Sequence, residues 1–317
     1  MMGLIAVRDN SELLKRLEAI NRKPLENKPD QNGEIESIKR KVRKSRNAEA
    51  APDEQQAILY KRDLPRTAKK PDARDASTGP GIVLEEAITG IEILAPLGGC
   101  AFLIETRLSE HEGKLPKVST AFEREFLNTE SSLRQRMNCA CEDRLGLEDI
   151  IFMDLETTGL SNSPVFLVGL LVWENGGLVV KQFFARNYSE EPAITSLFTQ
   201  SMTDKKLLVT FNGRSFDFPY MRVRAAATGI PFIPEPPHLD MLHVCRGIYK
   251  GVFENCKLQT LEKHVCGTTR YGDIPGHEIP DAYHHYVRTS DAEKIVRILR
   301  HNALDLITLA DLMTRLP

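Results

Sequence analysis

The sequence predicts an α/β fold, in which helices cover a mixed β-sheet. Three apolar segments between residues 150 and 185 follow one another with short turns, a pattern that predicts strands in hairpin order. Helical and strand-like segments then alternate, and the last segment is a long helical one. Hairpins followed by such an alternation are typical of a mixed sheet with helices packed on its faces.

Residues 1–81 differ from the rest of the chain in composition. Residues 10–23 predict a short amphipathic helix, because Leu13, Leu17 and Ile20 share one face. From residue 24 onward, charged residues, Asn and Pro dominate, so the segment cannot bury enough apolar surface to offset the entropy of ordering. We therefore expect a disordered linker. Its basic run at residues 39–46 is interpreted as a solvated charge block or, alternatively, as a tether for nucleic acid.

Residues 82–146 are expected to form a small β-rich extension that packs on the main domain. Gly98-Gly99 separates two of its apolar segments and predicts a hairpin turn between them. The expected strands are residues 82–86, 91–94 and 101–105, and the expected helices are residues 121–130 and 131–140.

The main domain is expected at residues 147–317. Residues 150–153 are all apolar, which predicts a central strand. Asn175-Gly176-Gly177 predicts a tight turn, and the segment from Ser290 to Glu293 matches a helix-capping box. The other expected strands are residues 164–173, 178–185, 207–211 and 238–240, and the expected helices are residues 190–202, 216–228 and 290–314.

Composition bears on the partners and the cellular location that we expect for the protein. The net charge is −2, so positive charge for a nucleic-acid partner must be placed locally. The six cysteines match neither a disulfide framework nor a zinc site, so we expect reduced thiols. The sequence shows no secretory signal, and no segment approaches the roughly 18 apolar residues that a membrane span requires. We expect a soluble cytoplasmic protein without a membrane partner.

Two carboxylates stand at the end of the central apolar strand. Asp154 and Glu156 are two residues apart, so both side chains point to the same side. Buried together they would repel each other and lose hydration, a conflict that bound Mg²⁺ or Mn²⁺ resolves. Thr157, Thr158 and Gly159 follow, with hydroxyl groups and an accessible backbone for a ligand. Alternatively, the two acids only cap the next turn.

Two further segments carry polar groups with related chemistry. Asp217 follows the apolar segment at residues 207–211 and begins a helix, at the strand edge where α/β sites commonly lie. The alternative is a helix cap stabilised by the helix dipole. His301 and Asp305 are four residues apart and share a helix face, where the imidazole can accept a proton from water. Alternatively, these two side chains satisfy each other.

The order of these segments resembles the DEDD exonucleases of the ribonuclease H-like superfamily, with Asp154, Glu156, Asp217 and Asp305 as the four acids. Within it, residues 82–317 are most similar to the bacterial YprB-type ribonuclease H-like domain. The supporting segments are residues 166–169, 209–217, 272–276 and 301–305. The resemblance implies a ribonuclease H-like mixed five-stranded sheet with flanking helices. It also implies metal-dependent 3′–5′ exonuclease activity on the phosphodiester bonds of nucleic acid.

The resemblance also implies a role for each acid. Asp154 would bridge two Mg²⁺ or Mn²⁺ ions, and Glu156 and Asp305 would complete the shell of the first ion. Asp217 would reach the second ion, and His301 would deprotonate the attacking water. The family usually places such a histidine five residues before the last Asp and a tyrosine four before it, so His301 occupies the tyrosine spacing.

The implied substrate is a single-stranded 3′ end of DNA or RNA, and neither haem nor a nucleotide cofactor is expected. Residues expected to contact it are Thr157, Thr158, Gly159, Leu160, Asn212, Arg214 and Phe216. Candidate phosphate-binding cations also include Arg222, Arg224, Arg246, Lys250, Lys257 and Arg270. Aromatic residues that either stack on bases or belong to the core are Tyr249, Phe253, Tyr271, Tyr283 and Tyr286. Asp240 is a candidate for an acid that contacts the metal ligands without binding the metal itself.

Two other functions fit the same residues. A non-catalytic nucleic-acid-binding or adaptor protein would use the same fold, with the basic tail for attachment and only a weak affinity for metal. A structure-specific endonuclease would cut within a strand instead of at its end. The motifs do not choose between DNA and RNA, because contacts to the 2′-hydroxyl cannot be read from them.

Overall fold

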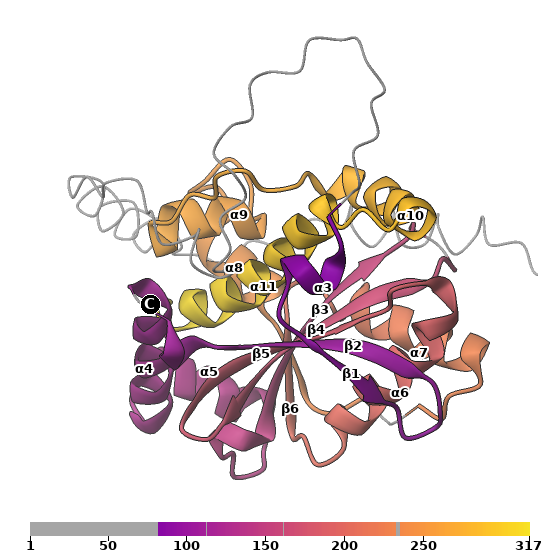
Figure 1. Cartoon of the computed structure of the whole chain (residues 1–317). Coiled ribbons are helices and arrows are strands. Elements are labelled where there is room, and N and C mark those ends of the chain that lie inside the picture. Colours follow the sequence, from indigo (N-terminus) through magenta and orange to yellow (C-terminus); the bar gives the residue numbers. More distant parts are fainter. Residues whose placement is uncertain (1–81, 112, 161, 233–234) are drawn as a thin grey trace, which may run out of the picture.

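The computed structural model describes residues 82–111, 113–160, 162–232 and 235–317. The helix expected at residues 10–23, the linker and its basic run lie outside the described residues. The described part is organised around one mixed sheet of seven strands, in the order β1-β2-β5-β4-β3-β6-β7 (Figure 1). The strands are β1 (Ile91–Leu94), β2 (Cys100–Arg107), β3 (Ile150–Thr157), β4 (Val165–Glu174), β5 (Gly177–Phe184), β6 (Leu207–Thr210) and β7 (His238–Asp240).

The pairing within the sheet confirms the predicted mixed architecture. β3, β4 and β5 follow one another as antiparallel neighbours, whereas β6 and β7 are added parallel to β3. These five strands come from the ribonuclease H-like region that the sequence predicts. β1 and β2 extend the sheet, because β2 pairs antiparallel with β5. The predicted Gly98-Gly99 turn joins β1 to β2, and both glycines adopt positive φ values.

Helices cover both faces of the sheet (Figure 1). They are α3 (Leu84–Ala87), α4 (Lys114–Leu127), α5 (Ser132–Ala140), α6 (Glu191–Met202), α7 (Asp217–Thr228), α8 (Met241–Tyr249), α9 (Leu258–Leu261), α10 (Ile279–Thr289) and α11 (Glu293–Met313). One apolar layer includes residues of α6, α7 and α10, and the other includes residues of α4, α5 and α8. The long helix α11 contacts β3, β4 and β5, so it spans the middle of the sheet.

Several local predictions differ from the structure. The helix expected at residues 121–130 instead spans Lys114–Leu127. Residues 82–86 are not a strand, because Leu84–Ala87 form the short helix α3. Leu84 within this helix and Ile88, the extended residue that ends it, are both buried, so the segment is anchored in the core. The predicted capping box is also absent. Ser290 ends α10 with φ +60°, and it is the Asp291 carboxylate that accepts the hydrogen bond from the Glu293 N–H.

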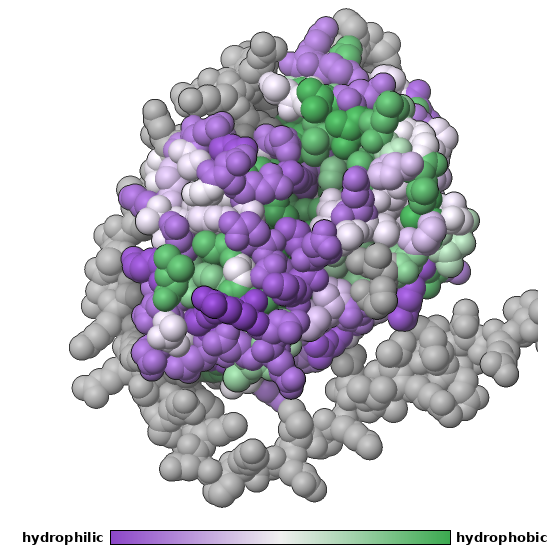
Figure 2. Space-filling model, turned by 90° about the horizontal axis from the view of Figure 1, so that it is seen from below, coloured by the Kyte–Doolittle hydropathy of each residue, from purple (hydrophilic) through white to green (hydrophobic). Residues whose placement is uncertain are grey.

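The surface is mostly hydrophilic on the side seen in Figure 2, where apolar patches are separated by polar side chains. Among the described residues, no helix combines the length and apolar character that crossing a membrane requires.

Candidate active site

Asp154 and Glu156 lie at the end of β3, in the centre of the sheet. They are placed opposite Gly169 and Leu167 of β4, and they point toward the face that α11 covers. Loss of hydration, then the negative charge of Asp305 and of other nearby acids, raises the pKa of both carboxyls well above the ordinary value. The two side chains therefore share one environment that penalises negative charge.

Asp217 is brought to the same place by α7. It is the first residue of this helix and is buried. Burial raises the pKa of the Asp217 carboxyl to about 7, the charges of Asp240 and Asp305 add to the effect, and backbone hydrogen bonds, including one from Leu155, oppose it. The predicted strand-edge position is therefore correct, and Asp217 lies beside β3.

His301 and Asp305 face the site from α11. The imidazole Nε2 of His301 lies 3.6 Å from Asp305 Oδ2, as their four-residue spacing predicts. The other ring nitrogen, Nδ1, lies 2.8 Å from Asp273 Oδ1. Burial acts to lower the pKa of His301, but the hydrogen bond with Asp273 and the charge of Asp305 outweigh it, so the pKa is raised. His301 is thus an imidazole held between two carboxylates.

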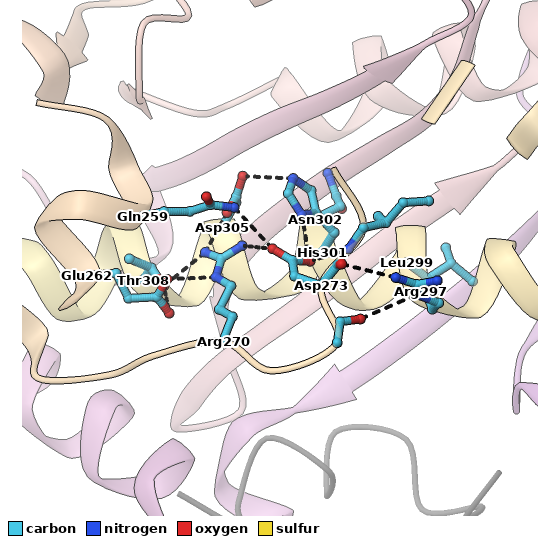
Figure 3. A network of polar contacts seen from close by, with 12 residues as sticks. Gln259, Glu262, Arg270, Asp273, Arg297, Leu299, His301, Asn302, Asp305 and Thr308 are labelled. Carbon is cyan, nitrogen blue, oxygen red and sulfur yellow. Dashed lines mark hydrogen bonds and ion pairs between the residues drawn. The ribbon is translucent and has the colours of Figure 1, made fainter. Parts of the chain in front are cut away.

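Arg270 lies between Glu262 and Asp305 (Figure 3). Its guanidinium is 2.5 Å from Asp305 Oδ1, 2.6 Å from Glu262 Oε2 and 3.5 Å from Asp273 Oδ2. The side chain is only 5% exposed, so Arg270 is a buried counter-ion and not the phosphate contact that the sequence suggested. Its positive charge compensates part of the negative charge on α11.

The structure brings the four predicted acids together. Asp154 lies close enough to Glu156, Asp217 and Asp305 for the charge of each to raise its pKa. Among the described residues, the ion pairs of these four acids are those of Asp305 with Arg270 and with His301. The charge of His301 also lowers the pKa of Asp154, but it is the smallest of the effects on that carboxyl. Negative charge on Asp154, Glu156 and Asp217 is therefore left largely uncompensated, and several carboxylate oxygens share one partly exposed site.

The donor set fits a hard divalent cation, because carboxylate oxygens are the ligands that Mg²⁺ and Mn²⁺ prefer. As arranged, however, the described residues contain no group of three or more His, Cys, Asp or Glu side chains that could hold a metal ion. The Arg270 guanidinium lies 2.5 Å from one carboxylate oxygen of Asp305, an oxygen that could otherwise face an ion.

The segment after Glu156 forms one wall beside the acids. Thr157 Oγ1 donates to the Gly159 carbonyl, and the Thr158 N–H and hydroxyl both donate to the Pro164 carbonyl. These bonds occupy the two hydroxyl groups that the sequence assigned to a ligand. Leu160 is 88% exposed, and it borders an open pocket of about 230 Å³ that is also lined by Phe216, Pro219, Tyr220 and Val223.

Asp240 organises the segment before α7. Its carboxylate accepts hydrogen bonds from the backbone N–H groups of Asn212, Arg214 and Leu242. Asn212 has φ +70°, a left-handed conformation that Asn tolerates better than most residues. The Arg214 side chain turns to the His238 carbonyl. Asp240 therefore anchors the turn that leads to Asp217.

The other candidate contacts divide into buried and exposed residues. Arg224 forms a partly buried ion pair with Glu191, so its guanidinium is already engaged. Tyr249, Tyr283 and Tyr286 belong to the core, Phe253 stacks on His264, and Tyr271 is exposed. Cations that remain exposed are Arg214, Arg222, Arg246, Lys250 and Lys257.

The sequence predicted no role for three residues at or just behind the site. Asp273 lies in residues 272–276, one of the segments that resemble the family, but the sequence predicts no function for it. Asn302 and Gln182 are fully buried, and Asn302 donates to Asp154 Oδ2 at 2.8 Å. For Asn302 the available signal was a polar residue within the apolar face of a helix, since such a group needs a partner.

A mixed sheet with acids on β3, α7 and α11 defines a ribonuclease H-like architecture. A family model of the RNase H superfamily matches residues 151–317, and the chain belongs to this superfamily.

The chain is also similar to the uncharacterized protein YprB of Bacillus subtilis (strain 168), with 32% identity over 169 residues. The match covers 52% of this chain and 41% of YprB, so the chain spans less than half of that relative. The predicted resemblance is thereby confirmed. A solved structure of the family B DNA polymerase from the hyperthermophilic archaeon Pyrobaculum calidifontis matches with a TM-score of 0.41 and 18% identity, over 51% of this chain and 24% of the polymerase chain.

Proposed function

We propose that this protein is a metal-dependent nuclease that hydrolyses phosphodiester bonds of DNA or RNA, and that it acts as a 3′–5′ exonuclease. One observation carries the proposal: Asp154, Glu156, Asp217 and Asp305 come from three separate elements and converge on one site with excess negative charge. Membership of the RNase H superfamily supports the nuclease chemistry.

In this proposal the four acids hold two Mg²⁺ or Mn²⁺ ions, with Asp154 shared between them. Bound ions of this kind lower the pKa of water and stabilise charge on the attacking and leaving oxygens. The contribution of the chain is to hold the carboxyl groups close together in an environment that penalises their negative charge until a cation is bound. The raised pKa of Asp154 and Glu156 supports this role, because a neighbouring dication would favour their ionised form.

His301 is proposed as the general base. With both ring nitrogens facing carboxylates, the imidazole favours its protonated form, which cannot accept a proton. If the charge of Asp305 were neutralised, the pKa of His301 would fall. The imidazole would then be more often neutral and able to accept a proton from water.

The terminal nucleotide is proposed to lie on the wall formed by Thr157, Thr158, Gly159 and Leu160. The exposed side chain of Leu160 and the half-buried ring of Phe216 border one pocket, which supports an apolar contact with a base. Asn212 and Arg214, which lie close to Asp217 in the sequence, are proposed to contact the phosphate group of that nucleotide.

The test is degradation of 5′-labelled single strands of DNA and RNA with Mg²⁺ or Mn²⁺. We expect stepwise shortening from the 3′ end, and loss of at least about 100-fold in rate for Asp154→Asn. Asp281→Asn changes an exposed carboxylate on α10 and serves as the control. Equal rates for wild type and Asp154→Asn would contradict the proposal, and cleavage of a substrate blocked at both ends would identify an endonuclease.

A non-catalytic nucleic-acid-binding protein is the second candidate. The ion pair between Arg270 and Asp305 favours it, because Arg270 stabilises Asp305 without a metal ion. Calorimetric titration with Mn²⁺ separates the two functions. Saturable binding that is lost in Asp154→Asn supports the nuclease, whereas no binding by the wild type supports the second candidate.

A further inference from the structure

Three residues on adjacent strands lie in one row beneath α11. Asp154 of β3 is opposite Gly169 of β4, and Gly169 is opposite Gln182 of β5. Residues opposite each other in a sheet point to the same face, which here is the face that contacts α11. The row therefore extends from the candidate metal site into the buried interior of the protein.

Asn302 of α11 bridges the two ends of this row. Its Nδ2 donates to Asp154 Oδ2 at 2.8 Å and to the Asp154 carbonyl at 3.2 Å. Its Oδ1 accepts a hydrogen bond from Gln182 Nε2 at 2.9 Å. Asn302 and Gln182 are both 0% exposed, so water does not replace either partner.

The direction of these hydrogen bonds follows from the groups at the two ends. Gln182 Nε2 also donates to the Leu299 carbonyl at 2.7 Å, and a carbonyl can only accept, so the amide of Gln182 has one orientation. The same argument applies to Asn302, whose NH₂ group meets the Asp154 carbonyl. Gln182 therefore orients the Asn302 amide, and Asn302 presents a donor to the Asp154 carboxylate.

Gly169 makes the bridge possible. A Cβ at this position would lie 2.0 Å from Asn302 Oδ1 and 2.7 Å from its Cγ, distances that real Cβ atoms do not show. The missing side chain leaves the space through which Asn302 crosses from Gln182 to Asp154. A glycine in the middle of a buried strand weakens the strand, so a specific close approach is the reason to find it there.

We propose that Gln182, Asn302 and Gly169 form a positioning relay that holds one oxygen of Asp154 and directs the other to the metal ions. This inference rests on the proposed nuclease function and names residues that touch neither metal nor substrate. A carboxylate shared between two ions must keep one orientation, and outer hydrogen bonds to metal ligands commonly supply it. Asn302 does this from α11, the helix that also carries His301 and Asp305.

The test is calorimetric titration of the full chain with Mn²⁺, which does not depend on activity. We expect Asn302→Ala to lower the affinity for Mn²⁺ by about 10- to 100-fold. Gln182→Met should lower it by several-fold, although Gln182 does not contact Asp154. Because both act through one contact, the double variant should match Asn302→Ala alone.

Ser119→Ala is the matched control. The Ser119 hydroxyl accepts a buried hydrogen bond from the Leu178 N–H of β5, so its loss destabilises the same strand away from the site. This variant should retain the affinity of the wild type. Gly169→Ala should reproduce the effect of Asn302→Ala, because its Cβ displaces the amide. Circular dichroism confirms that each variant is folded before titration.

Equal affinity for Mn²⁺ in wild type, Gln182→Met and Asn302→Ala would overturn the relay and leave the proposed function standing. A similar loss in Ser119→Ala would also overturn it, because general destabilisation would then account for the effect. No saturable binding by the wild type would overturn the relay and the nuclease proposal together.

Discussion

Asp273 Oδ1 lies 2.8 Å from His301 Nδ1, on a loop that no local pattern connects to α11. Arg297 fixes this loop by donating to the carbonyls of Gly272 and Asp273. In a neutral imidazole, a proton held on Nδ1 by Asp273 leaves Nε2 as the acceptor, and Nε2 is the nitrogen that faces Asp305. The loop thus selects the tautomer that a general base requires.

Replacing Asp273 with Asn should reduce turnover more than substrate binding. The Asn amide can present either its oxygen or its NH₂ group to Nδ1, so it no longer selects the tautomer with the proton on Nδ1. We therefore expect kcat to fall by about 10- to 100-fold while KM changes less than about threefold. Steady-state degradation of a labelled strand measures both constants. Asp281→Asn is the control on the surface of α10, and a loss confined to KM would contradict the role of Asp273.

The stability of the metal-free protein should fall as pH rises. The pKa of Asp217 is raised from 3.8 to about 7, so the folded state binds a proton more tightly than the unfolded state, and stability is lost between about pH 4 and 7. The raised pKa of His301 acts in the same direction, because its stabilising charge is present below pH 6.5 and is lost above the folded pKa.

Thermal unfolding in a chelator between pH 5.5 and 8 measures this dependence. We expect a decrease on the order of 2 kcal/mol in the free energy of unfolding, and a smaller decrease in Asp217→Asn. Stability that increases over this range would show that the acids do not share a desolvated site.

Arg270→Gln should destabilise the metal-free protein and increase its response to Mn²⁺. Removing the guanidinium leaves Glu262 and Asp305 without their buried counter-ion, which costs about 3 to 5 kcal/mol. It also frees Asp305, so Mn²⁺ should raise the Tm of the variant more than that of the wild type.

Arg224→Gln is the matched control for Arg270→Gln. Arg224 and Glu191 form another ion pair, partly buried, which lies outside the group of acids. This variant should lose stability while its Tm shift with Mn²⁺ stays that of the wild type. Equal shifts in all three proteins would mean that Arg270 does not compete with the ion.

Leu160→Ser should weaken substrate binding without affecting the fold. Leu160 is 88% exposed, so its removal leaves the core intact, but an apolar contact worth about 1 kcal/mol with a base would be lost. We expect a rise of about fivefold in KM with kcat unchanged. Leu97→Ser, at another exposed leucine, is the control, and an unchanged KM for Leu160→Ser would exclude this wall as the base contact.

The sequence alone determined the α/β class, the strands of the central sheet and the acids of the site. Alternation places Asp154 and Glu156 on one side of β3, and a spacing of four places His301 beside Asp305 on α11, because these relations depend only on local geometry.

Only the tertiary structure decided which distant residues support the acids. Asp154, Gly169 and Gln182 meet because β4 lies between β3 and β5, and Asn302 reaches them because α11 crosses that row. Arg270 similarly becomes a buried counter-ion through the packing of its loop on α11. Local periodicity predicts which way a side chain points. Which residue it then contacts depends on the order of the strands and the placement of the helices, and the neighbouring sequence does not predict these.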